Sequence, residues 1–284
     1  MNVELILLAL SPLFLACILA EFIHWRRRGA NGVYRLDDSL CNAALALMHQ
    51  GSDKIAWLCT LPLFDALYRH HALFVIRPGI GSTVALFLLQ DFLYYWFHRA
   101  SHRVRWLWAA HSVHHSSTLM NFSTAFRQSL MYPIAGMWAF WLPMAWIGFA
   151  PQSIVAVVLL NLAFQFFVHT RLTRRLGGLD WLFNTPSTHR CHHAKNPRYI
   201  DRNYAGVLVI WDRLFDSYVA ENPDDPCEFG TVKPVTSHNP LRVTFDEWIT
   251  MGREFLRVRG WRQRLAMLFA APERAADILA QNGR

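Results

Sequence analysis

The sequence predicts an all-α fold: an integral membrane helical bundle with a cytosolic helical cap that holds a His-rich dinuclear metal site. Three observations predict it. The chain of 284 residues is 53% hydrophobic and only 17% charged, whereas a soluble domain has about 25% charged residues. Apolar runs of about 20 residues, the length that crosses a bilayer, recur in its first half. Most of its 14 histidines fall in clusters just beyond these runs.

The first predicted domain, residues 1–78, consists of N-terminal membrane helices. An apolar run over 3–23 is followed by Arg26, Arg27 and Arg28. A signal peptide would carry its positive charges before the apolar run, so we expect an uncleaved helix whose C-terminal end is cytosolic. The segment 40–67 is apolar but interrupted at 49–54, and it forms either one kinked span or a re-entrant pair.

The second predicted domain, residues 79–220, is the catalytic core. A clear span over 79–97 places His98 at its end. Two shorter apolar runs, 131–149 and 152–168, are joined by Ala150 and Pro151, so 131–169 is expected to be a membrane hairpin. Its second arm would return His169 to the side on which His98 lies. The alternative is a buried helical hairpin of a soluble protein.

The third predicted domain, residues 221–284, is a cytosolic C-terminal tail. The composition becomes more polar from Arg171 onward, and 246–269 is expected to be an amphipathic helix rich in Arg and Trp. Such a helix can lie on a membrane surface or pack on the protein. The protein would thus be multi-pass, with its His boxes on the cytosolic face, because that side carries most arginines near the spans. These are Arg26, Arg27, Arg28, Arg99, Arg103, Arg105, Arg171, Arg174 and Arg175.

The net charge of +8 can indicate nucleic-acid binding. The arginines lie beside apolar runs and no nucleic-acid motif is present, so anionic lipid headgroups of a membrane are the expected partner and nucleic acid is not. The five cysteines form no C-x-x-C pair, which predicts reduced thiols rather than a disulfide framework. Cys191 lies inside a His cluster, but on a helix it would point away from the histidines.

The histidines carry the functional signal. One H-x-x-x-H box and two H-x-x-H-H boxes place their rings on single helix faces, and one isolated histidine lies between the last two boxes. Neutral imidazole suits iron, zinc, copper and nickel, and so many ligands exceed one coordination sphere. The sequence therefore predicts two neighbouring metal ions, with these residues as ligands and as the catalytic centre: His98, His102, His111, His114, His115, His169, His189, His192 and His193.

The other five histidines lack this pairing and are expected to be structural or solvated. They are His24, His49, His70, His71 and His238.

A metal-bound imidazole needs a hydrogen-bond acceptor for its second ring nitrogen. Four polar residues near the boxes are candidates for this second shell of contacts: Asp91, Asp180, Asn203 and Asp212. Asp91 is the strongest, because it lies two helical turns before His98 within an apolar span, where a charge is costly. Each of the four can instead be an ordinary cap or turn residue.

The order of the three boxes resembles the fatty acid hydroxylase and sterol desaturase superfamily of membrane di-iron enzymes. Five further stretches resemble its alkylglycerol monooxygenase branch: 90–99, 121–129, 184–189, 201–206 and 210–215. One departure concerns Arg103, which stands where the animal members have an acidic residue. Because arginine cannot accept a hydrogen bond, any acceptor role must be filled by another residue or be absent.

The resemblance implies a membrane-bound di-iron oxygenase that uses O2 to hydroxylate a C–H bond of a lipid. Its cofactors would be two Fe ions, which zinc can replace in purified protein. Cleavage of alkylglycerol ethers with tetrahydrobiopterin as reductant is what the branch implies, and a sterol or fatty acyl hydroxylase or desaturase is the alternative. No fused haem domain or flavin motif is visible, so an external electron donor is expected.

Two non-enzymatic alternatives remain at this stage. A metal transporter would place its ligands within the spans near the bilayer midplane, whereas these histidines lie at span ends and in the cap. An inactive lipid-binding homologue would usually lack a box histidine, and all are present.

Overall fold

The structure is a computed structural model that describes residues 3–282, and every regular element in that range is helical. Only isolated β-bridges, such as the one between Phe183 and Leu208, occur beside the helices. The all-α prediction is therefore confirmed. Residues 1–2 and 283–284, at the outer ends of the predicted first and third domains, lie outside the described residues.

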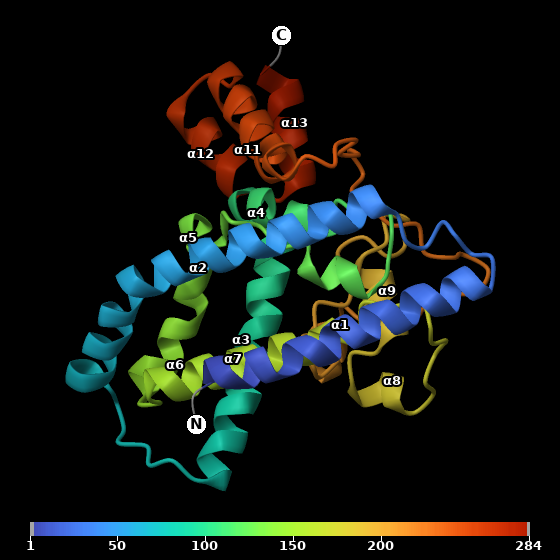
Figure 1. Ribbon diagram of the computed structural model, residues 1–284. Coiled ribbons are helices and arrows are strands. Elements are labelled where there is room, and N and C mark those ends of the chain that lie inside the picture. Colours follow the sequence, from blue (N-terminus) through green and yellow to red (C-terminus); the bar gives the residue numbers. More distant parts are fainter. Residues whose placement is uncertain (1–2, 283–284) are drawn as a thin grey trace.

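Two long helices, α1 (Val3–Arg27) and α2 (Leu36–His71), begin the fold. They run in roughly opposite directions across the molecule (Figure 1). The 36 residues of α2 form one unbroken helix through Gly51 and Pro62. Of the two alternatives for 40–67, one long helix is thus observed, and two separate half-segments are not.

The next two helices carry five of the predicted ligands. The 24 residues of α3 (Ile80–Arg103) end just after His98 and His102, and α4 (Arg105–His115) holds the first H-x-x-H-H box. Val104 between them adopts an extended conformation, with φ −121° and ψ 115°. This single residue turns the chain, so the two helices pack against each other (Figure 1).

The first arm of the predicted hairpin is not a continuous helix, and this expectation is wrong. Residues 131–149 contain three short pieces, α5 (Tyr132–Ala135), η2 (Met137–Trp141) and α6 (Leu142–Ile147). Gly136 has φ +82°, a left-handed conformation that ends α5. The second arm is α7 (Pro151–Phe166), which begins at the expected joint and is 16 residues long.

Within the described residues, two helices are long and apolar enough to cross a membrane, namely Ala9–Arg27 within α1 and Ile80–Arg103, which is α3. Their apolar windows are only 11% and 28% buried, so most of their side chains are left for contact with another apolar medium. The pieces Met137–Ile147 and Pro151–Phe166 are apolar but shorter.

The C-terminal part corrects a second expectation. The segment 246–269 is not one helix, since α11 (Pro240–Arg257), capped by Asn239, ends before Gly260, whose φ is +83°. The helices α12 (Trp261–Phe269) and α13 (Pro272–Asn282) follow. These three helices enclose a small core of their own around Val258, Met267 and Ala275.

This C-terminal group of helices lies beside α4 at the end of the molecule that is opposite the start of α3 (Figure 1). Arg105 at the start of α4 pairs with Glu247 and Glu254 of α11, at 3.2 and 2.5 Å. Of the two alternatives for the amphipathic segment, packing on the protein is therefore the one observed for α11.

Four short elements complete the fold and carry or surround the remaining histidines. They are η1 (Phe122–Phe126), α8 (Leu179–Leu182), α9 (Pro186–His192) and α10 (Ile210–Leu214). The helix α9 holds the second H-x-x-H-H box, and its last histidine caps it. A largely apolar cluster from α2, α3, η2, α6 and α7 lies on the N-terminal side of His98.

A buried polar network crosses this apolar region between α3 and α7. Asn161 donates to Gln90 and Asp91 at 2.9 and 3.0 Å, and Tyr94 donates to Gln165 at 2.8 Å. Gly206 packs directly on this network, because a Cβ atom there would lie 2.7 Å from Asn161 Oδ1.

We therefore expect Gly206→Ala to destabilise the protein by about 1–3 kcal/mol, the usual range for overpacking a buried site. Gly51→Ala is the matched control, because Gly51 lies in an exposed helix with no atom within 4 Å of an added Cβ. It should be neutral or stabilising by up to about 1 kcal/mol. Thermal unfolding in detergent measures both, and equal effects of the two substitutions would contradict the close packing.

Candidate metal centre

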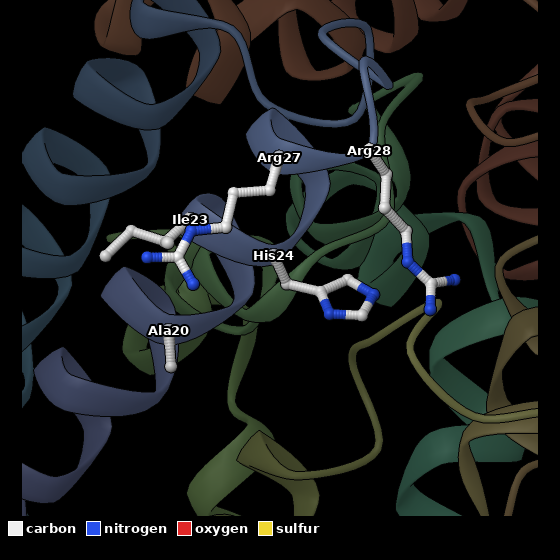
Figure 2. Close-up of a pocket in the computed structure, with 5 residues that line it drawn as sticks. All are labelled: Ala20, Ile23, His24, Arg27 and Arg28. Carbon is white, nitrogen blue, oxygen red and sulfur yellow. The ribbon is translucent and has the colours of Figure 1, made fainter.

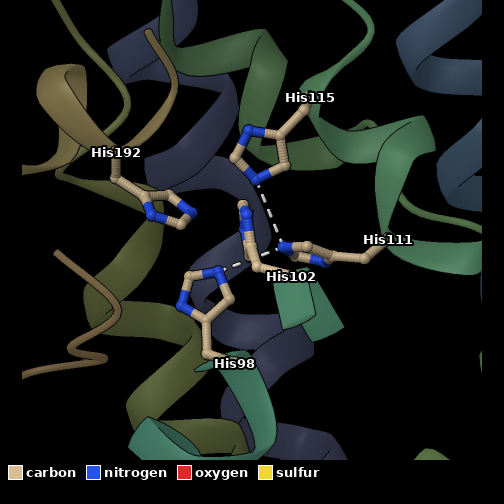
Figure 3. A group of neighbouring side chains, drawn as sticks. All are labelled: His98, His102, His111, His115 and His192. Atoms are coloured by element: carbon tan, nitrogen blue, oxygen red, sulfur yellow. Dashed lines mark hydrogen bonds between the residues drawn. The ribbon is translucent and has the colours of Figure 1, made fainter. Parts of the chain in front are cut away.

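The structure gathers all nine predicted ligands into two groups of buried side chains. The first, called here the five-histidine group, contains His98, His102, His111, His115 and His192 (Figure 3). The second, the four-histidine group, contains His114, His169, His189 and His193. Within each group the potential ligand nitrogens all lie within 4.8 Å of one another. The five other histidines belong to neither group.

Helical spacing divides each H-x-x-H-H box between the groups. In α4, the residues at i and i+4, His111 and His115, enter the five-histidine group, and His114 at i+3 enters the other. In α9 the assignment is reversed, since His189 and His193 enter the four-histidine group and His192 does not. Each box therefore contributes to both groups.

The separations between ring nitrogens match those of atoms that share one metal ion. In the four-histidine group, the Nε2 atom of His189 lies 2.9 Å from that of His169 and 3.0 Å from that of His193. In the five-histidine group, the Nε2 of His111 lies 3.1 Å from that of His98 and 3.2 Å from that of His115. Metal–nitrogen bonds of about 2.0–2.1 Å place neighbouring donor atoms about 2.9–3.4 Å apart.

Hydrogen bonding shows that some of these nitrogens carry no proton. The Nδ1 atom of His169 donates to the carbonyl of Gln165 at 2.6 Å, and that of His114 donates to the carbonyl of Arg127 at 3.1 Å. The same Nδ1 atom of His114 also lies 3.4 Å from Nε2 of Gln128. The contact with the carbonyl is shorter, so we assign the proton to Nδ1 of His114. In a neutral ring, a proton on Nδ1 leaves Nε2 with a bare lone pair. The two Nε2 atoms nevertheless face each other at 3.2 Å.

Two bare lone pairs at this distance repel each other unless a cation lies between them. The Nε2 atoms of His102 and His192 are likewise buried and have no hydrogen-bond partner. One metal ion in each group would satisfy these nitrogens, and an all-nitrogen donor set suits iron or zinc. The residues present thus fit a dinuclear metal centre.

Burial keeps these rings neutral, the form that binds metal. Removal from water, together with the neighbouring imidazoles, holds the pKa of each ring in α4 and α9 well below its usual value. Burial lowers the pKa of His169 to about 4. Near neutral pH the unprotonated nitrogens are therefore available to a cation without the prior loss of protons.

Backbone carbonyls hold the second nitrogens of four histidines. Besides the bonds of His114 and His169, the Nδ1 of His98 donates to the carbonyl of Tyr204 at 2.8 Å, and that of His192 to the carbonyl of Arg202 at 2.9 Å. In the described part of the chain, none of the four side chains proposed for this role, those of Asp91, Asp180, Asn203 and Asp212, hydrogen-bonds to a histidine. The expectation of direct contact is corrected accordingly.

Two of these four side chains instead hold the loop that supplies two of the carbonyls. Asp212 accepts from the backbone N–H groups of Tyr204 and Ala205 at 2.7 and 2.8 Å. Asp91 accepts from those of Val207 and Leu208 at 2.8 and 3.0 Å. These carboxylates therefore hold the backbone whose carbonyls contact the histidines, instead of contacting the histidines themselves as predicted.

The remaining contacts of the four are also structural. Asn203 donates to the carbonyls of Thr188 and Val219 at 3.0 and 2.8 Å. Asp180 accepts from the hydroxyl of Thr185 at 2.5 Å and from the backbone of Leu176 at 2.9 Å, which fixes the entry to α9. Burial raises the pKa of Asp212 to about 6.

Arg127 is a functional candidate that sequence reasoning missed. Its carbonyl holds His114, and its fully buried guanidinium donates to Asn42 at 2.9 Å, to Ser116 at 2.8 Å and to Asp38 at 3.3 Å. The guanidinium thereby joins Asp38 and Asn42 of α2 to Ser116 at the end of α4. Asp38 and Asn42 are one helical turn apart, so they share a face of the predicted helix, and this spacing is the sequence signal for the pairing.

The histidines outside the groups have other surroundings. His49 contacts the carbonyl of Ser129 at 3.1 Å and lies 3.3 Å from Asp53. His24 lines a surface hollow at the C-terminal end of α1 together with Ala20, Ile23, Arg27 and Arg28 (Figure 2). This hollow contains none of the nine candidate ligands.

Known proteins resemble this chain over the region that contains both groups. The family model for fatty acid hydroxylases matches residues 83–217, and all nine histidines lie within that range. Alkylglycerol monooxygenase of Xenopus tropicalis is 42% identical over 261 residues, which are 91% of this chain and 57% of that protein. The human protein of the same name is 36% identical over 265 residues, 92% of this chain and 58% of that protein.

A bacterial relative is more distant. Ornithine lipid hydroxylase OlsE of Rhizobium tropici is 31% identical over 154 residues, 52% of this chain and 44% of that protein. The chain spans little more than half the length of the two alkylglycerol monooxygenases. No solved structure matches it.

The depressed pKa values predict how the metal-free protein responds to pH. The rings of the two H-x-x-H-H boxes and of His169 have a lower pKa in the folded state than the value of about 6.5 in the unfolded chain, so the unfolded state binds more protons between about pH 6.5 and pH 4. The free energy of unfolding should then decrease as pH falls through this window, by about 1.4 kcal/mol per pH unit for each titrating ring. Thermal unfolding in detergent at pH 7.5, 6 and 5 tests this, and a constant unfolding temperature would contradict it.

Proposed function

We propose that the protein is a membrane-bound di-iron oxygenase that uses O2 to hydroxylate a C–H bond of a lipid, a proposal that the match of residues 83–217 to the fatty acid hydroxylase family model supports. The observation that carries this proposal is the pair of buried all-histidine groups, in which the bare Nε2 atoms of His114 and His169 face each other at 3.2 Å. The five-histidine group would hold one iron and the four-histidine group the other. Zinc would replace iron in purified material.

When bound, the two irons would supply the activation of O2 and the removal of a hydrogen atom from the substrate. The protein's own part is to hold nine neutral rings in place and to exclude water from them. Backbone carbonyls fix the tautomer of at least four rings, so that Nε2 is the atom offered to the metal. All nine histidines are buried, which keeps bulk water from the reacting centre.

An apolar wall next to the five-histidine group supports a lipid substrate. The ring of Tyr94 lies 5.4 Å from that of His98, and Phe97 and Trp141 lie 5.6 Å apart beside it. These residues belong to α3 and η2, the side from which a chain in the bilayer would approach. Burial of each CH₂ against such a wall stabilises binding by about 0.8 kcal/mol.

The proposed placement has α1 and α3 crossing the membrane, and the apolar α6 and α7 embedded beside them. His24, Arg27 and Arg28 project at the C-terminal end of α1 (Figure 2), where basic side chains indicate the cytosolic face. The two histidine groups and the helices α11 to α13 would then lie on that face. This agrees with a multi-pass protein whose His boxes are cytosolic.

Within this class, cleavage of an alkylglycerol ether with tetrahydrobiopterin as the external reductant is the proposed reaction. It is supported by the 36–42% identity to alkylglycerol monooxygenases. Hydroxylation or desaturation of sterols or fatty acyl chains is the second candidate, because the ornithine lipid hydroxylase also matches. A transporter is less well supported, since the histidines lie at the end of α3 and in α4 and α9 rather than within spans.

We expect His102→Ala and His193→Ala each to lower turnover by at least about 100-fold, because each removes one nitrogen from a different group. Each variant should still insert into membranes, since neither ring faces lipid. His70→Ala is the control, because His70 is exposed and belongs to neither group. Turnover and bound metal per chain are measured together, and full activity of both ligand variants would remove the dinuclear proposal.

The substrate proposal predicts aldehyde release from alkylglycerol only when tetrahydrobiopterin is present. The assay uses purified protein in detergent with alkylglycerol, free fatty acid or sterol, each with and without the pterin. The His102→Ala variant gives the background. Turnover of only acyl or sterol substrates, independent of pterin, would overturn the ether-lipid assignment and leave the lipid hydroxylase standing.

A further inference from the structure

A short segment, residues 201–204, faces three of the five rings in the five-histidine group. The carbonyl of Arg202 accepts from His192 at 2.9 Å, and that of Tyr204 accepts from His98 at 2.8 Å. The carboxylate of Asp201 lies 3.6 Å from Nδ1 of His102.

The backbone of this segment is held in an unusual conformation. Asp201 has φ +58° and Asn203 has φ +57°, a left-handed region that non-glycine residues rarely adopt and that Asp and Asn tolerate best. Such strain persists only where the surroundings impose it. Here Asn203 bonds to Thr188 and Val219, and Asp212 bonds to the next backbone N–H groups.

Arg103 fixes the carboxylate of Asp201 from the other side. It follows His102 directly, and its Nη1 atom lies 2.5 Å from Oδ2 of Asp201 and 3.1 Å from Glu273 of α13. Arg103 therefore binds Oδ2 of Asp201, and Oδ1 is the atom that faces His102. Arginine itself cannot accept a hydrogen bond from the ring, but it holds the carboxylate of Asp201, which can.

We propose that Asp201 is the positioning residue of His102, with its carboxylate held by Arg103 so that the ring keeps its proton on Nδ1 and directs Nε2 into the five-histidine group. The proposal rests on the proposed metal centre. It is supported by the Nε2 atom of His102, which is buried and has no hydrogen-bond partner. The contact of 3.6 Å is longer than a hydrogen bond, so its effect depends on the negative charge of the carboxylate.

The placement gives His102 a property that the other rings lack. Four rings have a neutral carbonyl at Nδ1, whereas His102 faces an ionised acceptor. A carboxylate at the second nitrogen makes an imidazole a stronger metal ligand. The five-histidine group should therefore lose metal affinity when this charge is removed, and the four-histidine group, which Asp201 does not contact, should not.

The test compares retention of Co²⁺ by the full-length protein in detergent. Metal-free wild type and Asp201→Asn are each loaded with two equivalents, challenged with increasing EDTA, and followed by metal analysis and by the visible absorption of Co²⁺. Asparagine keeps the left-handed backbone and removes the charge. We expect the variant to lose one equivalent at about tenfold less EDTA than wild type and to keep the second as wild type does.

Two further variants separate the charge from the loop. Asp216→Asn is the matched control. Asp216 has the same left-handed backbone conformation, with φ +55°, but it is exposed and contacts none of the rings. This variant should therefore behave as wild type. Arg103→Gln should weaken the same single equivalent, and the double variant Arg103→Gln with Asp201→Asn should show no further loss. Thermal unfolding and circular dichroism of every variant report on folding.

Three outcomes would overturn the inference. Wild-type retention by Asp201→Asn would show that the charge has no role. Parallel loss of both equivalents with a lower unfolding temperature would show that Asp201 supports the fold and not one ring. Failure of the wild type itself to bind two equivalents would overturn the metal centre, and the inference with it, whereas the first two outcomes leave the metal centre intact.

Discussion

Nine imidazole rings turn ring nitrogens toward one another inside the protein, and the repulsion between those that carry no proton sets the requirements for the rest of the fold. His114 and His169 illustrate it, since both have their Nδ1 protons committed to carbonyls while their Nε2 atoms lie 3.2 Å apart. Burial prevents relief by protonation, because it disfavours the charged ring. Packing and hydrogen bonds of the surrounding protein must therefore hold the rings in position until cations occupy the space between them.

The chain meets this requirement with carbonyls that are themselves fixed by charged or polar side chains. The carbonyl of Arg127 is held because the guanidinium of the same residue is tied to Asp38 and Asn42 of α2. The carbonyl of Tyr204 is held because Asp212 receives the adjoining N–H groups. A carboxylate placed directly among the rings could itself bind the metal and change the donor set toward oxygen. Carbonyl acceptors keep both groups all-nitrogen, while the charges that stabilise these carbonyls stay one step away; the carboxylate of Asp201, which faces His102, is the exception.

This division explains what the sequence could predict and what it could not. The nine histidines were predictable, because helical spacing follows directly from the order of residues. The hydrogen-bond acceptors of their second nitrogens were not predictable, because every residue has a backbone carbonyl and the sequence does not single one out. Asp91 was expected to contact His98, but the partner is the carbonyl of Tyr204, 106 residues away. The pairing of Arg127 with Asp38 spans 89 residues and needs the folded chain. The interruption of the helix within 131–149 is consistent with Gly136, Pro133 and Pro143, which disfavour a continuous helix. The apolar composition of the segment alone predicts an unbroken span.

The two histidine groups form one unit rather than two independent sites. Each H-x-x-H-H box gives i and i+4 to one group and i+3 to the other, so α4 and α9 cannot shift relative to one ion without moving ligands of the second. Rings of different groups also touch, with His115 stacked on His193 at 4.3 Å between ring centroids. An H-x-x-x-H pair alone, as in α3, serves a single group. The additional histidine at i+3 is therefore what turns two helices into a shared frame, and it accounts for why both boxes carry a third ring at that position.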